Sequence, residues 1–284
     1  MARRPVVTDG AWGTELQKLG LSPGEHPDLW NLSHPDRVEQ VAARYVEAGS
    51  DVILTNTFRS NRVALGAAGA TADIPALNAR GVEISRRAAG GRARVFASVG
   101  PSGKMLMTGE VTENELSSAF AEQCHALAGA GADALLIETM SDLDEARIAV
   151  KAARTTGLPV IASMVFDSGK DRDRTMMGAT PEQAAAGLTE AGADVIGANC
   201  GLGIEGYIPV CGRLRKATTL PLWIKPNAGM PEMVDGRITY RTTPEQFASG
   251  ARELRKAGAD FIGGCCGTTP AFLRAVAAAL RGND

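Results

Sequence analysis

The sequence of 284 residues predicts an α/β protein in which eight parallel strands close into a (β/α)8 TIM barrel. Two observations lead to this prediction: a short motif recurs four times along the chain, and eight apolar runs alternate with helical segments. The length is close to the roughly 250 residues typical of such barrels, which favours a closed barrel. An open doubly wound sheet is the alternative.

The recurring motif is a turn of small residues followed by Asp and an apolar run. It occurs at Glu47-Ala-Gly-Ser-Asp51, Gly129-Ala-Gly-Ala-Asp133, Glu190-Ala-Gly-Ala-Asp194 and Lys256-Ala-Gly-Ala-Asp260. In each copy we expect an amphipathic helix to end at the glycine and a buried strand to begin after the Asp. Four further strands are expected between these copies, at residues 5–8, 94–99, 159–165 and 220–225.

The helices between the strands carry clear start signals. Thr180-Pro-Glu-Gln183 and Thr243-Pro-Glu-Gln246 place Thr at the N-cap, Pro in the first turn and Gln three residues after the Thr. Thr112-Glu-Asn-Glu115 has the same spacing, with Glu in place of Gln. We therefore expect helices to begin at these three places. No linker rich in Pro or Ser divides residues 1–284, so we expect a single barrel domain.

Composition excludes several classes of protein. The chain is 44% apolar and 22% charged with a net charge of −2, so neither nucleic acid nor a membrane surface is an expected partner. No apolar stretch approaches the roughly 20 residues that span a bilayer, and the first residues lack an apolar signal core. We therefore expect a cytoplasmic protein whose five cysteines stay reduced unless they bind metal or take part in chemistry.

Chemistry in a (β/α)8 barrel takes place where the strands end. The residues of chemical interest expected at these ends are Asp9, Gly10, Asn56, Glu138, Asn199, Cys200, Lys225, Asn227, Cys265 and Cys266. Packing alone does not place acids and thiols at such positions. The strand ends therefore predict a functional site.

Three thiols dominate this predicted site. Cys265 and Cys266 lie in Gly263-Gly-Cys-Cys-Gly-Thr268, and Cys200 ends a stretch that aligns with this one at an offset of 66 residues. Three thiolates suit zinc, and three protein ligands leave a fourth tetrahedral position open for a substrate thiol, which the metal would deprotonate. Copper(I) and an iron–sulfur cluster fit less well, because the Cys-x2-Cys spacing is absent. A redox dithiol, or chance placement of the three cysteines, would also produce this pattern.

The remaining candidate motifs favour structural roles. Cys124 and Cys211 lie within expected helices and are interpreted as small core residues. The three histidines fall before or within helices, which argues against a Ser–His or Cys–His relay. Gly201-Leu-Gly-Ile-Glu-Gly206 has the spacing of a dinucleotide-binding loop. However, it lies in the sixth βα unit, and the next strand ends without an acid for a ribose.

Two acids accompany the thiols at the strand ends. Asp9 and Glu138 can together clamp an ammonium group, although each can instead cap a helix. Backbone N–H groups at Gly10, where a helix is expected to begin, can hold a carboxylate. A zwitterionic amino acid whose thiol reaches the metal would satisfy both. Asn56 and Asn199 are polar donors in the same ring, and each can instead serve the loop backbone.

These segments resemble the homocysteine S-methyltransferase family, which includes betaine–homocysteine methyltransferase and the homocysteine-binding barrel of cobalamin-dependent methionine synthase. The resemblance covers nearly the whole chain and rests on Thr8-Asp-Gly-Ala-Trp-Gly-Thr14, Thr55-Asn-Thr-Phe58, Ile137-Glu-Thr139, Gly197-Ala-Asn-Cys200, Lys225-Pro-Asn-Ala-Gly229 and the two-cysteine motif. It implies a (β/α)8 barrel with one Zn²⁺ per chain on Cys200, Cys265 and Cys266, and homocysteine as methyl acceptor. It also implies that Asp9 and Glu138 hold the amino group, with Gly10 near the carboxylate.

The resemblance leaves the methyl donor open. Thr139 stands where betaine-dependent members have an aromatic residue, whereas the segment that begins at Lys225 is similar to the methionine synthase barrel. The donor is either a separate corrinoid protein at the barrel mouth or a small onium compound, for which Trp12, Trp30 and Phe58 are candidate cation–π partners.

The expected activity is methyl transfer to homocysteine, which forms methionine. The residues alone leave two further functions open. One is a methyltransferase for another thiol or selenol acceptor, which would use the same metal site without the two acids. The second is a non-catalytic barrel that senses metal or redox state through the adjacent thiols of Cys265 and Cys266.

Overall fold

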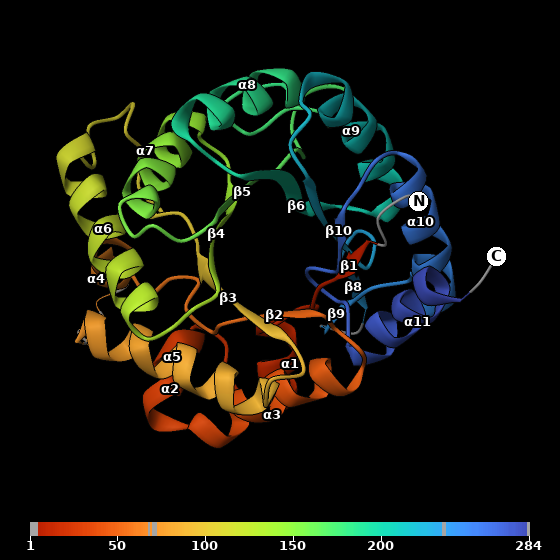
Figure 1. The fold of residues 1–284 in the computed structure, drawn as a ribbon, viewed down its shortest axis with the longest axis horizontal. Coiled ribbons are helices and arrows are strands. Elements are labelled where there is room, and N and C mark those ends of the chain that lie inside the picture. The colour runs from red at the N-terminus through yellow and green to blue at the C-terminus, as the bar shows by residue number, and fades with distance from the viewer. Residues whose placement is uncertain (1–4, 68, 70–72, 235–236, 283–284) are drawn as a thin grey trace.

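A computed structural model describes residues 5–67, 69, 73–234 and 237–282. Figure 1 shows the strands gathered in the middle of the molecule, with helices around them as an outer ring. One sheet holds eight parallel strands in the order β1-β10-β7-β6-β5-β4-β3-β2. Its strands are β1 (Val6–Val7), β2 (Val52–Leu54), β3 (Arg94–Val99), β4 (Ala134–Met140), β5 (Val160–Met164), β6 (Val195–Gly203), β7 (Leu222–Asn227) and β10 (Phe261–Ile262).

The helices come before, between and after these strands. They are α1 (Gly13–Lys18), α2 (Trp30–Ser33), α3 (Pro35–Glu47), α4 (Arg62–Ala67), α5 (Ile74–Ala89), α6 (Glu113–Gly129), α7 (Leu143–Arg154), α8 (Pro181–Ala191), α9 (Ile204–Ala217), α10 (Pro244–Lys256) and α11 (Pro270–Arg281), with a short 3₁₀ helix η1 (Pro27–Leu29). Thr112, Thr180 and Thr243 form reciprocal capping boxes at the starts of α6, α8 and α10, so the three predicted helix starts are confirmed.

The sheet closes where β1 meets β2. The backbone N–H of Asp51, just before β2, donates to the carbonyl oxygen of Val7 in β1 at 2.7 Å. Further along the same pair of strands, the backbone N–H of Leu54 donates to Oδ2 of Asp9 at 2.8 Å. The (β/α)8 barrel predicted from the sequence is therefore confirmed, and the open sheet is excluded.

The Asp of the recurring motif explains why the motif recurs. Asp133 accepts a hydrogen bond from the backbone N–H of Val95 in β3 at 2.8 Å and donates its own N–H to the carbonyl of Val95 at 2.8 Å. The other copies make the same two bonds to the preceding strand: Asp51 to Val7, Asp194 to Val160 and Asp260 to Leu222. A slip of one residue would break both bonds, so each Asp fixes the register of two strands.

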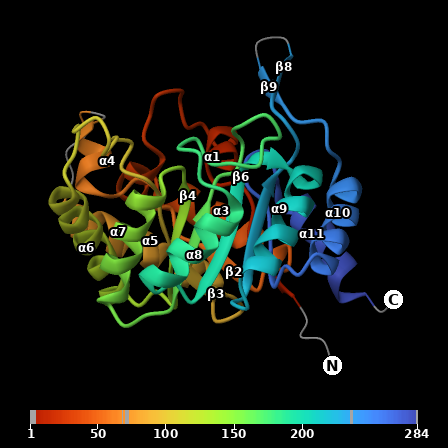
Figure 2. The ribbon, with the colours of Figure 1, turned by 90° about the horizontal axis from the view of Figure 1, so that it is seen from above.

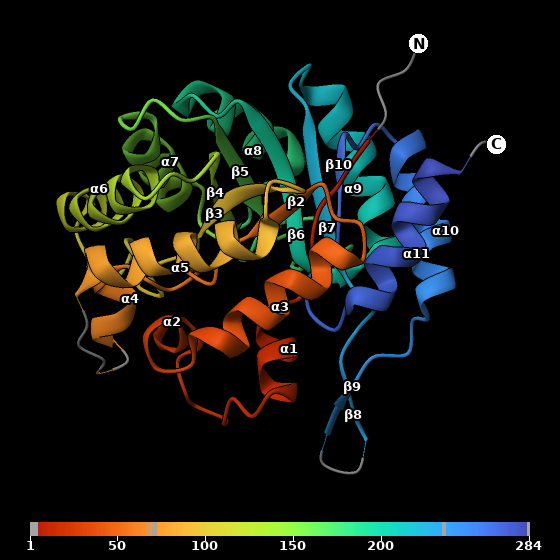
Figure 3. The ribbon, with the colours of Figure 1, turned by 60° about the horizontal axis from the view of Figure 1, so that its bottom comes forward.

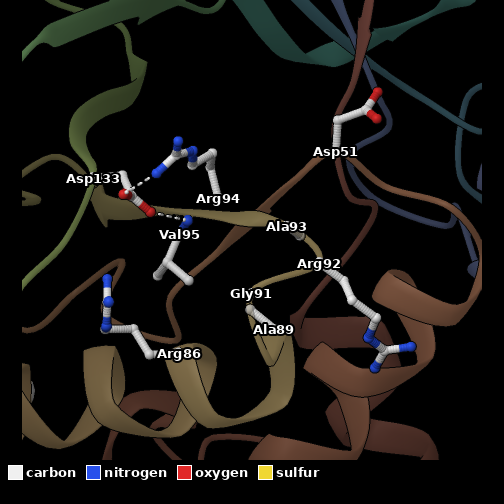
Figure 4. Close-up of a pocket in the computed structure, with 9 residues that line it drawn as sticks. All are labelled: Asp51, Arg86, Ala89, Gly91, Arg92, Ala93, Arg94, Val95 and Asp133. Atoms are coloured by element: carbon white, nitrogen blue, oxygen red, sulfur yellow. Dashed lines mark hydrogen bonds and ion pairs between the residues drawn. The ribbon is translucent and has the colours of Figure 1, made fainter.

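A cavity of about 410 Å³ lies beside two of these Asp residues, Asp51 and Asp133, at the amino-terminal ends of the strands (Figure 4). Among its charged groups, Arg94 contacts Asp133 at 3.2 Å, and Arg86 donates to the carbonyl of Gly131 at 2.7 Å. The carboxyl ends of the strands, where the sequence places the chemistry, lie at the other end of the barrel. This cavity is therefore separate from the candidate site.

The interior of the barrel is filled by aromatic and aliphatic side chains. Trp223 of β7 is fully buried, and its ring lies 6.0 Å from that of Phe96 and 5.5 Å from that of Phe261. Gly197 on the neighbouring strand leaves room for it, because a Cβ at this position would lie 2.0 Å from the carbonyl oxygen of Trp223. The indole of Trp223 fills the barrel interior next to Lys225, which belongs to the candidate site.

Several boundaries differ from the sequence-based expectation. β6 continues to Gly203, beyond the point where Cys200 was expected to end it, and β10 has only two residues. A hairpin of β8 (Glu232–Val234) and β9 (Arg237–Thr239) was not predicted. It lies between β7 and α10 and projects from the same end of the barrel as α1 (Figures 2 and 3).

Two further sequence-based expectations concern burial and membranes. Cys124 in α6 and Cys211 in α9 are fully buried, as predicted for core residues. Burial raises the pKa of each of these thiols to about 12, so they stay protonated and unreactive. Among the described residues, no helix is long and apolar enough to cross a membrane.

Candidate metal and substrate site

The three predicted thiols meet at the carboxyl end of the barrel. Cys200 lies in β6, and Cys265 and Cys266 follow β10. Their Sγ atoms all lie within 4.8 Å of one another, and those of Cys200 and Cys266 are 3.8 Å apart. Sulfur atoms at these separations can share one ion, so the structure contains a three-cysteine cluster that fits a metal site.

An unusual backbone conformation turns Cys200 toward its partners. Its φ is 63°, in the left-handed region that non-glycine residues seldom adopt, and Gly201 follows with a φ of 68°. The pairing of β6 with β7 shifts register between Asn199 and Gly203, which contains this turn. Tyr207 stabilises this turn, because its hydroxyl donates to the carbonyl of Asn199 at 3.0 Å. Such strain is typical of sites where function fixes the position of a side chain.

Glycines and backbone bonds hold the adjacent pair, Cys265 and Cys266. Gly264 has no space for a side chain, because a Cβ there would lie 2.3 Å from Oγ1 of Thr268. The N–H of Cys265 donates to the carbonyl of Pro226 at 2.7 Å, and the carbonyl of Cys266 accepts from the N–H of Ala228 at 2.9 Å. The end of β7 and the residue after it thus fix both cysteines.

The three thiols lie close enough to influence one another's protonation. Hydrogen bonds from Cys265 and Cys266 lower the pKa of Cys200, because they stabilise its thiolate. The same contacts with Cys200 raise the pKa of Cys265 and Cys266, since a second thiolate would lie beside the first. Without a metal the cluster therefore favours a single negative charge. A cation that binds all three sulfurs must displace the remaining protons.

A buried ion pair forms the floor of the site. Asp9 is fully buried, and its Oδ1 accepts from Nζ of Lys225 at 2.6 Å. Its Oδ2 accepts from Nε1 of Trp12 at 2.8 Å and from the N–H of Leu54 at 2.8 Å. The Lys225 ammonium lies 5.7 Å from the ring centroid of Trp223, its neighbour two residues earlier on the inward face of β7. Lys225 was expected at a strand end, but its pairing with Asp9 was not predicted.

Glu138 is the second acid of the site. It lies near the end of β4, is buried, and accepts a hydrogen bond from Oγ of Ser98 to Oε1 at 2.5 Å. Among the described residues, Oε2 has no hydrogen-bond partner. Burial raises the pKa of Glu138, although the positive charge of Lys225 opposes this shift. Glu138 therefore retains a free acceptor oxygen in a position that favours contact with a cation.

Asn199 connects the ends of three strands. Its Oδ1 accepts from the N–H of Thr139 at 2.9 Å and from Oγ of Ser163 at 2.6 Å, and its Nδ2 donates to Oγ1 of Thr139 at 2.7 Å. Thr139 has a φ of 61°, and these bonds stabilise that conformation. A substrate-binding role for Asn199 stays a prediction. Its contacts hold Thr139, the residue after Glu138, against Asn199, the residue before Cys200.

Asn56 and Gly10, the remaining predicted substrate-binding residues, also have neighbours within the protein. Nδ2 of Asn56 donates to the carbonyl of Pro27 at 2.8 Å and to Oδ1 of Asn31 at 3.1 Å. Gly10 packs so closely that a Cβ would lie 2.8 Å from both Tyr45 and Thr268. These contacts explain the residue types by loop packing, and the predicted substrate contacts stay predictions.

The aromatic candidates for a cationic donor lie in different surroundings. Trp12 is bonded to Asp9 at the floor of the site. Trp30 instead packs on His34, 4.5 Å between ring centroids, with Arg37 above its ring at 5.2 Å. Tyr240, which sequence reasoning missed, is an aromatic residue close to the cysteines. Its ring covers Gly267 so closely that a Cβ there would lie 2.4 Å away, and burial followed by the nearby thiols raises its pKa to about 12.

Comparison with known proteins identifies the family. The family model for homocysteine S-methyltransferase matches residues 6–280, almost the whole chain. The chain belongs to the homocysteine S-methyltransferase family. Membership agrees with the resemblance seen in the sequence motifs.

Two curated relatives and one solved structure show how far the similarity extends. The chain is 32% identical to methionine synthase of Mycobacterium leprae over 304 residues, and 31% identical to methionine synthase of Mycobacterium tuberculosis over 299 residues. These matches cover 100% and 99% of this chain but only 25% of each relative, so the chain spans about a quarter of their length. The metallated form of the homocysteine methyltransferase MmuM from Escherichia coli superimposes with a TM-score of 0.80 at 25% identity, over 98% of this chain and 96% of that one.

Proposed function

We propose that this chain is a zinc-dependent methyltransferase that transfers a methyl group from an onium compound or a methylcorrinoid to the thiol of homocysteine, forming methionine. The observation that carries this proposal is the cluster of Cys200, Cys265 and Cys266, whose sulfurs lie within 4.8 Å of one another. Family membership supports the acceptor and the reaction. The metallated MmuM neighbour supports the presence of a metal.

The donor set fits one Zn²⁺ per chain. Three sulfur ligands suit a borderline-soft, tetrahedral ion and leave one coordination position for a substrate. Zinc bound there would deprotonate an incoming thiol at neutral pH. Three thiolates around a dication leave a net charge near −1. That charge favours an electron-rich acceptor sulfur and attracts a cationic donor.

The protein itself orients the acceptor. We propose that the free Oε2 of Glu138 receives the ammonium group of homocysteine, with the carboxylate beside the backbone at Gly10. Transfer forms an S–CH₃ bond at the acceptor as the bond between methyl and donor breaks, and the electron pair of that bond stays with the donor. The thiol proton is lost to solvent. Because this is an in-line displacement, holding the two reactants in position supplies much of the rate.

Two kinds of methyl donor fit the proposed site. A separate corrinoid protein that docks at the barrel mouth is one source, supported by the similarity to a quarter of each methionine synthase. A small onium compound is the second, supported by the negative centre and by Tyr240 next to the cysteines. Thr139, in place of an aromatic residue, argues against betaine.

A metal-quantified methylation assay tests the proposal. Zinc-loaded protein is incubated with homocysteine and, in parallel, with betaine, S-methylmethionine, S-adenosylmethionine, dimethylsulfoniopropionate or methylcobalamin, and methionine is measured. We expect methionine with at least one donor, and about one zinc per chain. Purified protein that holds no zinc, forms a reversible Cys265–Cys266 disulfide and makes no methionine would instead support a redox-sensing barrel.

A further inference from the structure

One side chain packs against the glycine that follows each of two clustered cysteines. These glycines, Gly201 and Gly267, have φ angles of 68° and 80°. A Cβ on Gly201 would lie 2.8 Å from Cβ of Asp167 and 3.3 Å from its carboxyl carbon. A Cβ on Gly267 would lie 2.4 Å from the ring of Tyr240. The sulfurs of the two cysteines before these glycines are 3.8 Å apart, so an acid and an aromatic ring both lie beside the cluster.

Asp167 has a carboxylate oxygen to spare. It is an exposed residue that follows the end of β5 by three positions. Its Oδ1 accepts from Oγ of Ser168 at 3.0 Å, whereas Oδ2 has no partner and the side chain forms no ion pair among the described residues. Asp167 therefore adds a negative charge beside thiols that can themselves become anionic. Two like charges at this place favour the approach of a cation.

Tyr240 presents its ring at the same place. It is half-buried and directly follows β9, at the base of the hairpin that projects from this end of the barrel (Figure 2). Its hydroxyl has no hydrogen-bond partner in the part of the chain that the structure describes. The ring itself is held by its packing on Gly267. An aromatic ring in this position can bind a cation through its π face.

The loops that carry these two side chains meet at the mouth of the barrel. Nη1 of Arg172, in the loop after β5, lies 3.6 Å from Sδ of Met230, in the loop after β7. Asp167 and Tyr240 belong to these same two loops. The contact holds both loops at one part of the mouth, beside the cysteine cluster. The acid and the ring are therefore available to the same ligand.

We propose, resting on the proposed function, that Asp167 and Tyr240 form the binding position of the methyl donor and select an onium cation. Asp167 would supply the opposite charge, and Tyr240 the face of its ring. Transfer breaks the bond between the methyl carbon and the onium sulfur or nitrogen, and the electron pair stays on that atom. The donor then leaves as a neutral thioether or amine. Loss of its positive charge removes both attractions, which favours release of this product.

Two probes of nearly equal shape test whether the charge is recognised. Choline carries a quaternary ammonium group, and 3,3-dimethylbutan-1-ol has a carbon atom in place of the nitrogen and no charge. Their dissociation constants are measured by NMR titration of the zinc-loaded full chain saturated with homocysteine. For Asp167→Asn and for Tyr240→Leu we expect choline to bind about threefold to fivefold more weakly, and the alcohol to stay within about twofold.

Two matched variants serve as controls. Asp171→Asn removes the same charge from an exposed position of the same loop, and Tyr240→Phe keeps the ring. Both should bind choline as the wild type does. Zinc is quantified in every variant, because the Tyr240 ring packs on the glycine after Cys266. Zinc retained in Tyr240→Leu shows that a loss of choline binding comes from the ring and not from a damaged cluster.

Three results would overturn the proposal. The first is a wild type that binds choline no better than the alcohol, or binds neither probe. The second is an Asp167→Asn variant that retains zinc and binds choline as well as the wild type, or weakens both probes equally. The third is an Asp171→Asn variant that loses as much choline affinity as Asp167→Asn, since the effect would then be one of general charge.

Failure of this inference is distinguishable from failure of the proposed function. If the zinc-loaded protein neither binds homocysteine nor forms methionine with any donor, the proposed function fails. If methionine forms from methylcobalamin alone, and choline binding is insensitive to Asp167→Asn and Tyr240→Leu, the proposed function stands. Only the onium position at these two residues is then wrong.

Discussion

Replacement of Glu138 by Gln tests how the site recognises the amino group of its acceptor. Gln has the same shape and can still accept the hydrogen bond that Ser98 makes at 2.5 Å, so the change removes a charge while keeping the local structure. Loss of one partner of a buried charged pair costs about 2–5 kcal/mol. Lys225 remains paired with Asp9 in the variant, and no new unpaired charge is created, so we expect the low end of this range.

The expected result is a rise of roughly 30-fold in KM for homocysteine, which corresponds to about 2 kcal/mol. Zinc content and kcat should change much less, because Glu138 lies outside the three-cysteine cluster and, as proposed, would contact the acceptor away from its sulfur. The assay is steady-state methylation with the best donor, together with metal analysis of the same preparation. The surface variant Glu253→Gln is the matched control, since Glu253 is an exposed residue of α10 whose ion pair is with Lys256.

The pH dependence gives a second measurement on the same variant. Burial raises the pKa of Glu138, so its carboxylate becomes protonated at a higher pH than an exposed glutamate does. As the pH falls through this raised pKa, the ammonium contact is lost and KM should rise in the wild type. The Gln variant should lack this rise. A variant with unchanged KM, or one whose pH profile runs parallel to that of the wild type, would remove Glu138 from the proposed role.

Three further predictions concern the metal and the fold. Cys200→Ser should lose most of its zinc by metal analysis, whereas Cys211→Ser, a buried helical thiol, should retain it; equal zinc in both would contradict the metal assignment. Asp133→Ala should lower the free energy of unfolding by about 1.5–3 kcal/mol in urea denaturation, because its carboxylate accepts the N–H of Val95; no loss would contradict the register role. Burial raises the pKa of Asp28 from 3.8 to about 7, so between these two pH values the folded state keeps a proton on Asp28 that the unfolded state loses. The free energy of unfolding should therefore fall as the pH rises from 3.8 to about 7. The loss is at most about 4 kcal/mol, and Asp28→Asn should flatten the curve; parallel curves for both proteins would refute this account.

The sequence was sufficient to predict the barrel because the relevant signals are local. Each copy of the small-residue and Asp motif contains both the end of a helix and the start of a strand, and the Asp makes its bonds to the strand just before it. The capping boxes span only four residues. The thiol cluster was predictable for the same reason: two aligned strand ends carry cysteines, and parallel strands bring their ends together.

The charged floor could not be predicted in the same way. Lys225 and Asp9 are 216 residues apart, and their contact depends on which strands lie next to one another and on which side chains point inward. The sequence shows a single lysine at the end of an apolar strand, two residues after a tryptophan, which is the available signal. It does not show that the lysine pairs with Asp9.

The role of Asn199 was hidden for a related reason. A polar residue beside a predicted metal ligand is as consistent with substrate binding as with structural support, and the sequence does not show its three short bonds to Thr139 and Ser163. Those bonds stabilise a left-handed threonine. No local pattern marks Thr139, or Cys200 itself, for that conformation.

Asp9 links barrel closure to the charged floor of the candidate site. One oxygen of its carboxylate holds Leu54 and so joins β2 to β1, the point where the sheet closes, and the other oxygen holds Lys225. The position of the lysine ammonium is therefore set by the same side chain that completes the barrel, and through β1 and β2 by the whole ring of strands. A flexible lysine gains a fixed location in this way, because both its partner and the strands around it belong to the closed ring.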